Sequence, residues 1–137
     1  MKHWLLKSEP FKWSWAQQVE AAEKGTHWNG VRNHLAKIQL QTMKIGDLGF
    51  FYHSNEGKEI VGIVEVIREY YPDPEDEKGQ FCLVDLKAVR PLKAVTLKDV
   101  KATPSLAKMS LITSMRLSVQ PVTSDEWHII LKMAGEA

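Results

Sequence analysis

The chain has 137 residues, of which 44% are hydrophobic and 26% are charged, as in an average globular domain. Its 18 basic and 17 acidic residues nearly balance, which excludes binding to nucleic acid through charge alone. The single cysteine excludes a disulfide framework. No apolar run reaches the roughly 18 residues of a membrane span, and no signal-peptide pattern is present. We therefore expect one cytoplasmic domain over residues 1–137, with no membrane contact.

Charge is unevenly distributed along the chain. Residues 69–85 contain six acidic residues and one lysine, whereas residues 86–116 contain seven basic residues and one aspartate. Such segregation usually marks solvated faces, although a basic face can also follow a phosphate backbone. The second stretch is therefore a candidate for contacts with nucleic-acid phosphates.

The first third of the chain predicts a strand followed by two helices. Pro10 ends the strand, because proline cannot donate to a sheet ladder. Ser14 and Gln17 match a helix capping box, and Gly25 is placed to end that helix. In chain order we expect a strand at His3–Lys7, a helix at Gln17–Lys24, a loop at Thr26–Asn33, a helix at Leu35–Met43 and a turn at Ile45–Asp47.

Beyond this turn the apolar residues alternate or run continuously, which is typical of strands. Gly62 interrupts a run of valine and isoleucine and predicts a bulge or the close approach of another group. The expected elements are strands at Leu48–His53, Ile60–Arg68, Phe81–Val89 and Met115–Val119, a hairpin turn at Asn55–Gly57, an acidic loop from Tyr71, a short helix from Thr96 to Lys101, a helical turn opened by Pro104 and a terminal helix at Glu126–Met133. This order predicts an α+β fold with a mixed or barrel-like sheet.

Sequence signatures of catalysis are missing. The chain has no phosphate-binding loop, no paired-glycine dinucleotide fingerprint and no serine elbow. Its five histidines follow no zinc-ligand spacing, and no cysteine pair accompanies them. We therefore predict no catalytic residue, no metal site and no cofactor, and we expect Cys82 to be a buried, inert thiol.

Tryptophan is concentrated near the start of the chain. Trp4, in a strand, and Trp127, on the last helix, are expected to lie in the core. Trp13, Trp15 and Trp28 flank turns or loops, and hydroxyl, amide and imidazole groups are close to them in sequence. Aromatic faces with a few planar hydrogen-bonding groups suit a nucleobase, because each stacked base contributes about 1–3 kcal/mol. The alternative is that these tryptophans only fill the core of a small domain.

Several blocks of residues, in the right order, resemble the EVE domain family. The blocks are His3–Pro10, Trp13–Trp15, Trp28–Asn33, Met43–Asp47, Phe50–Asn55, Ile60–Val66, Tyr71–Asp73, Val84–Asp85 and Met115–Val122. The resemblance covers the chain from end to end and so implies a stand-alone EVE domain. It also implies a PUA-like fold, a curved sheet or partial barrel with peripheral helices, related to the YTH domains that hold a methylated base in an aromatic cage.

The resemblance further implies a reader of modified bases. Its partner would be DNA or RNA containing modified bases, or a modified nucleotide, with one base flipped out into an aromatic pocket. Trp28, with Trp15 or Tyr52, would stack on the base. Hydroxyl and amide groups would bind the base edge, and a guanidinium would hold a phosphate or a carbonyl oxygen. The expected base-binding residues are Ser8, Trp15, Trp28, Arg32, Asn33, Tyr52, His53 and Ser54, and the expected backbone contacts are Lys7, Lys37 and Arg116.

Two other functions stay open on the sequence alone. PUA-like relatives include domains suspected of RNA cleavage or amide hydrolysis, and His53, with Ser8 and Glu9, offers an acid and a base for such a reaction. The acidic stretch 69–85 would instead suit a protein partner. An enzyme would show turnover that depends on His53, whereas an interaction module would keep its partner after nuclease treatment.

Overall fold

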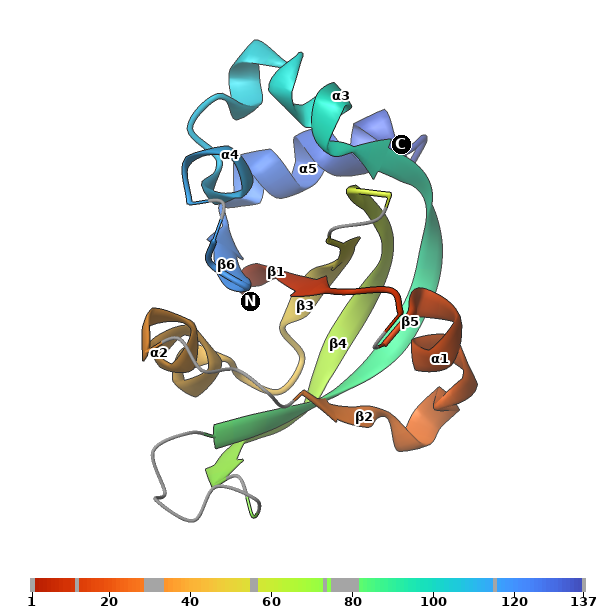
Figure 1. Cartoon of the computed structure of the whole chain (residues 1–137), viewed down its shortest axis with the longest axis vertical. Coiled ribbons are helices and arrows are strands. Elements are labelled where there is room, and N and C mark those ends of the chain that lie inside the picture. The colour runs from red at the N-terminus through yellow and green to blue at the C-terminus, as the bar shows by residue number, and fades with distance from the viewer. Residues whose placement is uncertain are drawn as a thin grey trace.

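The computed structural model describes residues 2–11, 13–28, 34–54, 57–72, 74, 82–114 and 116–136. Its described strands form one mixed sheet of six, in the order β2-β5-β4-β3-β1-β6. These are β1 (His3–Ser8), β2 (Thr26–Trp28), β3 (Leu48–His53), β4 (Glu59–Pro72), β5 (Cys82–Thr96) and β6 (Val119–Val122). Strands β1 and β3 are parallel, and the other neighbours are antiparallel. The sheet curls into a half-barrel (Figure 1), which confirms the predicted fold class.

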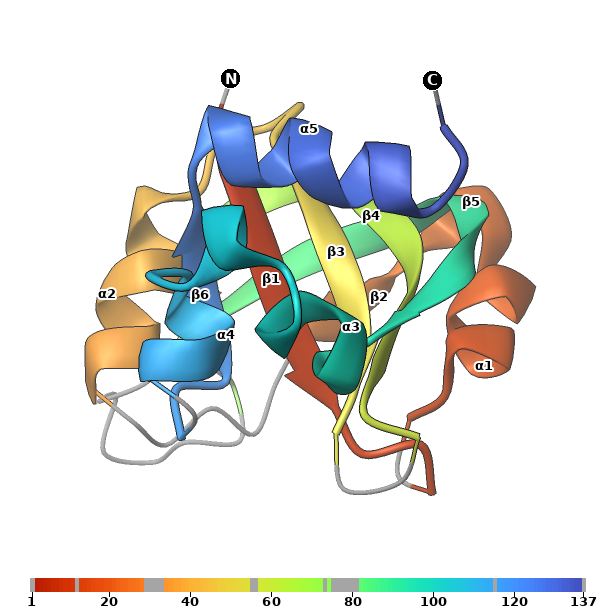
Figure 2. The ribbon, with the colours of Figure 1, turned by 90° about the horizontal axis from the view of Figure 1, so that it is seen from above.

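Helices pack against both faces of this sheet. They are α1 (Trp15–Glu20), η1 (Ala22–Lys24), α2 (His34–Thr42), α3 (Leu97–Lys101), η2 (Pro104–Leu106), α4 (Ser110–Thr113) and α5 (Ser124–Met133). Figure 2 shows α3, α4 and α5 over the sheet, with α1 and α2 at opposite sides. Capping boxes begin α1 and α5, as the sequence predicts at Ser14 and Thr123, and a third begins α3 at Thr96. None of the helices among the described residues is long and apolar enough to cross a membrane.

The long hairpin of β4 and β5 gives the sheet its curl. Its pairing register shifts at four places, and such bulges bend and twist a strand. The strand expected at Phe81–Val89 does not end at Val89, because β5 continues through Pro91 to Thr96. Pro91 lies opposite Gly62 beside one of the shifts, where the regular ladder is interrupted and a missing N–H costs little.

Three other expected boundaries are also wrong, because pairing with distant strands decides them. Residues 26–28 form strand β2, which pairs with β5, rather than the start of a loop. The last strand is Val119–Val122 instead of Met115–Val119, since only this segment pairs with β1. The strand expected to end at Arg68 runs on to Pro72.

Side chains from the two faces of the sheet form two cores. The α2-side core lies inside the curl and contains Trp4, Leu6, Trp28, Leu40, Met43, Phe51, Val64, Val66, Val84, Leu86, Leu117 and Val119. The α5-side core lies under the C-terminal helices and includes Leu5, Phe50, Tyr52, Ile60, Trp127 and Ile130. Trp4 and Trp127 are 2% and 3% exposed, which confirms their predicted place in the core.

Candidate base-binding site

The parallel pairing of β1 and β3 brings three of the expected site residues together. Ser8 and His53 are partners in register, at the C-terminal ends of their strands. The backbone N–H of Ser54 donates to the carbonyl oxygen of Ser8 at 2.9 Å. Because parallel strands end at the same edge of a sheet, residues 45 positions apart in the chain become neighbours. The candidate site is therefore built at this edge, where β1 and β3 end.

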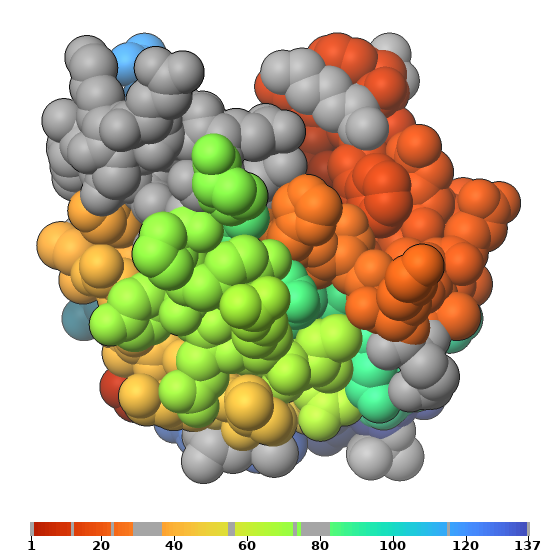
Figure 3. Space-filling view, turned by 90° about the horizontal axis from the view of Figure 1, so that it is seen from below, coloured from red at the N-terminus to blue at the C-terminus, as the bar shows by residue number. Residues whose placement is uncertain are grey.

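The segment after β1 folds back over this edge. The Ser8 hydroxyl donates to the carbonyl oxygen of Trp13, and the Trp13 N–H donates to the carbonyl oxygen of Glu9 at 3.0 Å. The Trp13 indole N–H then donates to the side-chain oxygen of Gln18 at 2.8 Å. Figure 3 shows a notch in the molecular surface beside the red lobe that this N-terminal part of the chain forms. The turn thus forms one wall beside the sheet edge.

Gln18 fixes α1 against the sheet. Its side chain is fully buried, and its amide nitrogen donates to the carbonyl oxygen of Leu86 in β5 at 3.1 Å. One amide therefore satisfies a backbone acceptor of the sheet and the indole donor of Trp13 at the same time. Gln18 is not among the predicted site residues, because nothing in a helical pattern marks one glutamine as buried.

Trp15 begins α1 and is held by two contacts. Its backbone N–H, which has no partner within the helix, donates to Nε2 of His53 at 3.0 Å. Its indole lies directly over Gly62, where an added Cβ would be 2.4 Å from the ring. Trp15 is therefore the close-approaching group that the glycine in β4 predicts.

Phe51 connects the rings of the site. Trp15, Trp28 and His53 each meet its ring edge-on, with centroid distances of 5.4, 5.8 and 5.7 Å. We call these four residues the aromatic cluster. Trp28 is only 7% exposed, so most of its ring belongs to the α2-side core and only a small part remains for a ligand. Phe51 was missing from the predicted set, although its two-residue spacing from His53 places both on one strand face.

Tyr52 and Lys7 lie on the opposite face of the sheet, contrary to the predicted pocket. Side chains alternate along a strand, so both point away from the face that carries Ser8 and His53. Tyr52 is buried in the α5-side core, and this burial raises its pKa to about 12. The Lys7 ammonium lies 6.0 Å from the centroid of the Tyr52 ring, and burial lowers the pKa of Lys7.

The remaining expected residues do not lie at the shared edge of β1 and β3 among the described residues. Arg32 and Asn33 lie outside the described residues. Lys37 is on α2, and exposed Arg116 precedes Leu117; both flank the α2-side core that also contains Trp28. In the stretch 86–116, two basic residues pair with acidic side chains and two others lie on α3. The pairs are Lys87–Glu65 at 3.7 Å and Arg90–Glu136 at 2.7 Å, and the α3 lysines are Lys98 and Lys101.

The hydrogen bond from Trp15 defines the chemical state of His53. Because Nε2 accepts, the ring is neutral and carries its proton on Nδ1. Burial lowers the pKa of His53, and the charge of Glu59 opposes this only in part. A histidine whose Nε2 is occupied by a backbone N–H serves a structural role, which argues against its use as an acid or base in hydrolysis.

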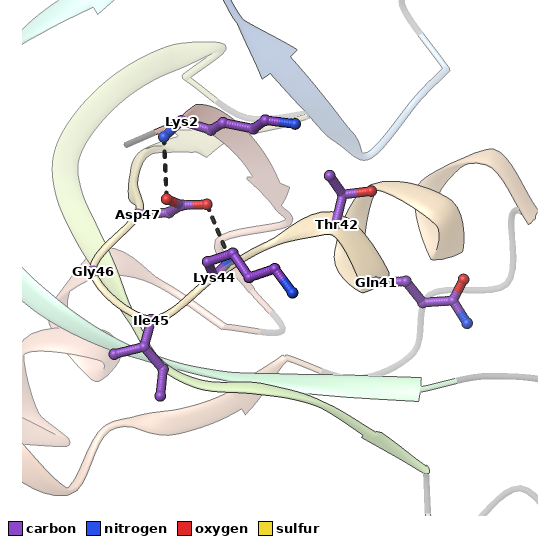
Figure 4. A pocket seen from close by; sticks show the side chains of 7 residues that line it. All are labelled: Lys2, Gln41, Thr42, Lys44, Ile45, Gly46 and Asp47. Atoms are coloured by element: carbon purple, nitrogen blue, oxygen red, sulfur yellow. Dashed lines mark hydrogen bonds between the residues drawn. The ribbon is translucent and has the colours of Figure 1, made fainter.

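A second concavity lies at the other end of β1 and β3 (Figure 4). It is lined by Lys2, Gln41, Thr42, Lys44, Ile45, Gly46 and Asp47, none of which belongs to the predicted site. Asp47 is buried and accepts hydrogen bonds from the backbone of Lys2 and Lys44 and from the indole of Trp4, at 3.0–3.1 Å. Its carboxylate is thereby committed to holding the chain together. No group of three or more potential metal-binding side chains occurs within the described ranges.

The cap of α1 gives a prediction specific to the site. The Ser14 hydroxyl accepts from the N–H of Gln17 at 3.2 Å, so Ser14→Ala should lower the free energy of unfolding by about 1 kcal/mol. Because Trp15 follows directly, we expect affinity for the ligand to fall as well. Thr123→Ala removes the same kind of cap from α5 and is the matched control. Chemical denaturation should show similar losses for both variants, and equal losses of affinity would contradict a special role for α1.

A curled mixed sheet with helices packed on both faces agrees with the PUA-like fold that the sequence resemblance implies. The family model described as EVE domain matches residues 2–133, and the chain belongs to the EVE domain family. Thymocyte nuclear protein 1 of Gallus gallus is 34% identical over 98% of this chain and 69% of its own length.

Solved structures agree with this assignment. An NMR structure from Rhodopseudomonas palustris is 58% identical, with a TM-score of 0.94 over 98% of this chain and 94% of that one. Human THYN1, in complex with 5-methylcytosine containing DNA, is 30% identical, with a TM-score of 0.91 over 100% and 99% of the two chains. A YTH domain of Zygosaccharomyces rouxii shares the fold, with a TM-score of 0.61 at 16% identity over 96% of this chain and 85% of that one.

Proposed function

We propose that this EVE domain binds nucleic acid by taking one modified base, flipped out of its stack, against the aromatic cluster. The observation that carries the proposal is the meeting of Ser8, His53 and Ser54 with Trp15 and Trp28 at one sheet edge. The human relative, whose structure matches the whole of this chain, was crystallised with 5-methylcytosine containing DNA, which supports the same class of ligand here.

The proposed roles follow from the chemistry of each side chain. The exposed parts of the Trp15 and Trp28 rings stack on the base. The Ser8 hydroxyl donates to Trp13, and its lone pairs are the acceptors for an amino group on the base edge. Arg32, Asn33 and Ser54 complete the recognition of the base edge and phosphate, and Lys37 and Arg116 contact the backbone. Lys7 and Tyr52 are left out because they face the other core.

Two further predictions, on domain organisation and on location, belong to this proposal. The first is that residues 1–137 act as one domain. A cytoplasmic location stays a prediction, since the curated relatives carry the word nuclear in their name.

Binding of short labelled oligonucleotides tests the proposal. We expect DNA with 5-methylcytosine, or RNA with N6-methyladenosine, to bind roughly tenfold more tightly than the same strand without the methyl group, through stacking and pocket shape. Higher salt should weaken both complexes but leave their ratio unchanged, because phosphate contacts carry no base information. Equal affinity for modified and unmodified strands would contradict the proposal.

A substitution of Trp28 tests its role in binding only if the α2-side core stays folded. Truncation of a buried tryptophan to alanine costs about 3–5 kcal/mol, so loss of binding in Trp28→Ala would not separate folding from recognition. Trp28→Phe keeps a ring in the α2-side core and should still weaken binding. Trp127→Phe makes the same change in the α5-side core and should leave the affinity unchanged.

The state of His53 predicts a pH dependence. Its folded pKa lies below the 6.5 of a free histidine, so the unfolded chain takes up the proton first as the pH falls. Its contribution to stability is therefore complete above about pH 6.5 and is lost as the pH falls through the folded pKa. The protonated ring also has no lone pair for the N–H of Trp15, so affinity should fall over the same range. Denaturation of the wild type and of His53→Gln between pH 7.5 and 5 should give a smaller pH dependence in the variant, and identical curves would contradict this.

A further inference from the structure

We propose that the ligand is a duplex and that Phe11 inserts into the base stack where the flipped base has left. This inference rests on the proposed function and names both the form of the nucleic acid and the residue that stabilises its distorted state. A single strand or a free nucleotide needs no such residue, because no stack has to be refilled. Phe11 therefore distinguishes between these ligands.

Phe11 is unusually exposed for a phenylalanine. Its side chain is 68% exposed, the highest value for a large hydrophobic side chain among the described residues. Phenylalanine side chains are usually well buried, because burial of a ring this size is worth about 1.5–3 kcal/mol. A largely exposed aromatic ring on a loop beside a binding site is a candidate contact for the ligand.

The place of Phe11 connects it to the candidate site. It lies three residues after Ser8, so the two Cα atoms are at most about 10 Å apart. Between them are Glu9 and Pro10, in the turn that folds back over the end of β1. Phe11 thus belongs to the turn after β1, which lies beside the aromatic cluster.

The turn is also fixed in position. The Ser8 hydroxyl and the Glu9 carbonyl both bind the backbone of Trp13, and proline fixes one backbone angle at position 10. The Trp13 indole is anchored in turn by buried Gln18. An aromatic side chain on a braced turn keeps its position when it is pushed into a stack, which a side chain on a loose loop does not.

An inserted aromatic ring would offset part of the free energy lost when a base is flipped out. Extruding a base breaks its pairing and stacking and leaves a gap in the duplex. Apolar side chains, phenylalanine among them, are inserted between base steps by proteins that distort DNA. Insertion would bury the exposed ring and restore stacking around the gap, and both effects favour the flipped state.

The test compares the same modified base in a duplex and in a single strand. We expect Phe11→Ala to weaken binding to the duplex at least fivefold while leaving the single strand within twofold of wild type. Phe11→Leu, which retains an apolar wedge, should recover part of the duplex affinity. Ile45→Ala is the matched control, since Ile45 is 64% exposed and lies at the opposite end of β3, by the concavity in Figure 4.

Unchanged duplex affinity in Phe11→Ala, or equal losses for duplex and single strand, would overturn the inference while the proposed function stands. If the wild type binds neither form, the proposed function itself fails.

Discussion

Replacement of Gly62 by alanine is expected to lower the free energy of unfolding by about 1–3 kcal/mol and to weaken ligand binding roughly tenfold. The new Cβ would lie 2.4 Å from the atoms of the Trp15 indole, a distance at which the rigid ring has to move. Moving the ring also breaks its edge contact with Phe51, on which the cluster is built. In most strands glycine to alanine is neutral or favourable, so a loss here would identify the ring as its cause.

A double-mutant cycle separates this clash from other effects. The ring atoms nearest to the new methyl belong to the six-membered ring and its fusion with the five-membered ring, and phenylalanine is shorter at this point. Gly62→Ala should therefore cost less in a Trp15→Phe background than in the wild type, as measured by urea denaturation. Equal costs in both backgrounds would show that the indole does not depend on the glycine.

Replacement of Gln18 by leucine is expected to lower the free energy of unfolding by about 2–4 kcal/mol, although the two side chains are similar in size. The change removes the acceptor of the part-buried Trp13 indole N–H and a donor to the carbonyl oxygen of buried Leu86. With α1 and the turn after β1 both loosened, ligand affinity should fall as well.

Gln41 provides the comparison for this variant. It is exposed on α2, so Gln41→Leu should change stability by no more than about 0.5 kcal/mol. Thermal and chemical denaturation of the two variants measure the difference. Similar stability for Gln18→Leu and Gln41→Leu would contradict the role of the buried amide.

Local signals in the sequence predicted much of the fold. Capping boxes at Ser14 and Thr123 and the apolar run of β3 depend on neighbouring residues, and each is found where expected. Strand β2 and the passage of β5 through Pro91 depend instead on partners far away in the chain. A pattern read along the chain does not contain those pairings, so these boundaries were missed.

The candidate site was predicted in part for the same reason. Ser8, Trp15 and His53 belong to sequence blocks that resemble the family, and the structure brings them together. Tyr52 was included as an aromatic ring of the same family block as His53, although alternation along a strand sends neighbours to opposite faces. Gln18 acts by reaching across to β5, a contact that sequence spacing does not reveal.

The most direct test of the proposed site follows the five tryptophan indole N–H signals in nitrogen–proton NMR spectra. Assignment by single substitution to phenylalanine identifies each signal. Addition of an oligonucleotide carrying a single modified base should shift the signals of Trp15 and Trp28, and leave Trp127, in the other core, unchanged. Shifts at Trp127 with none at Trp15 and Trp28 would place the ligand elsewhere and contradict the account.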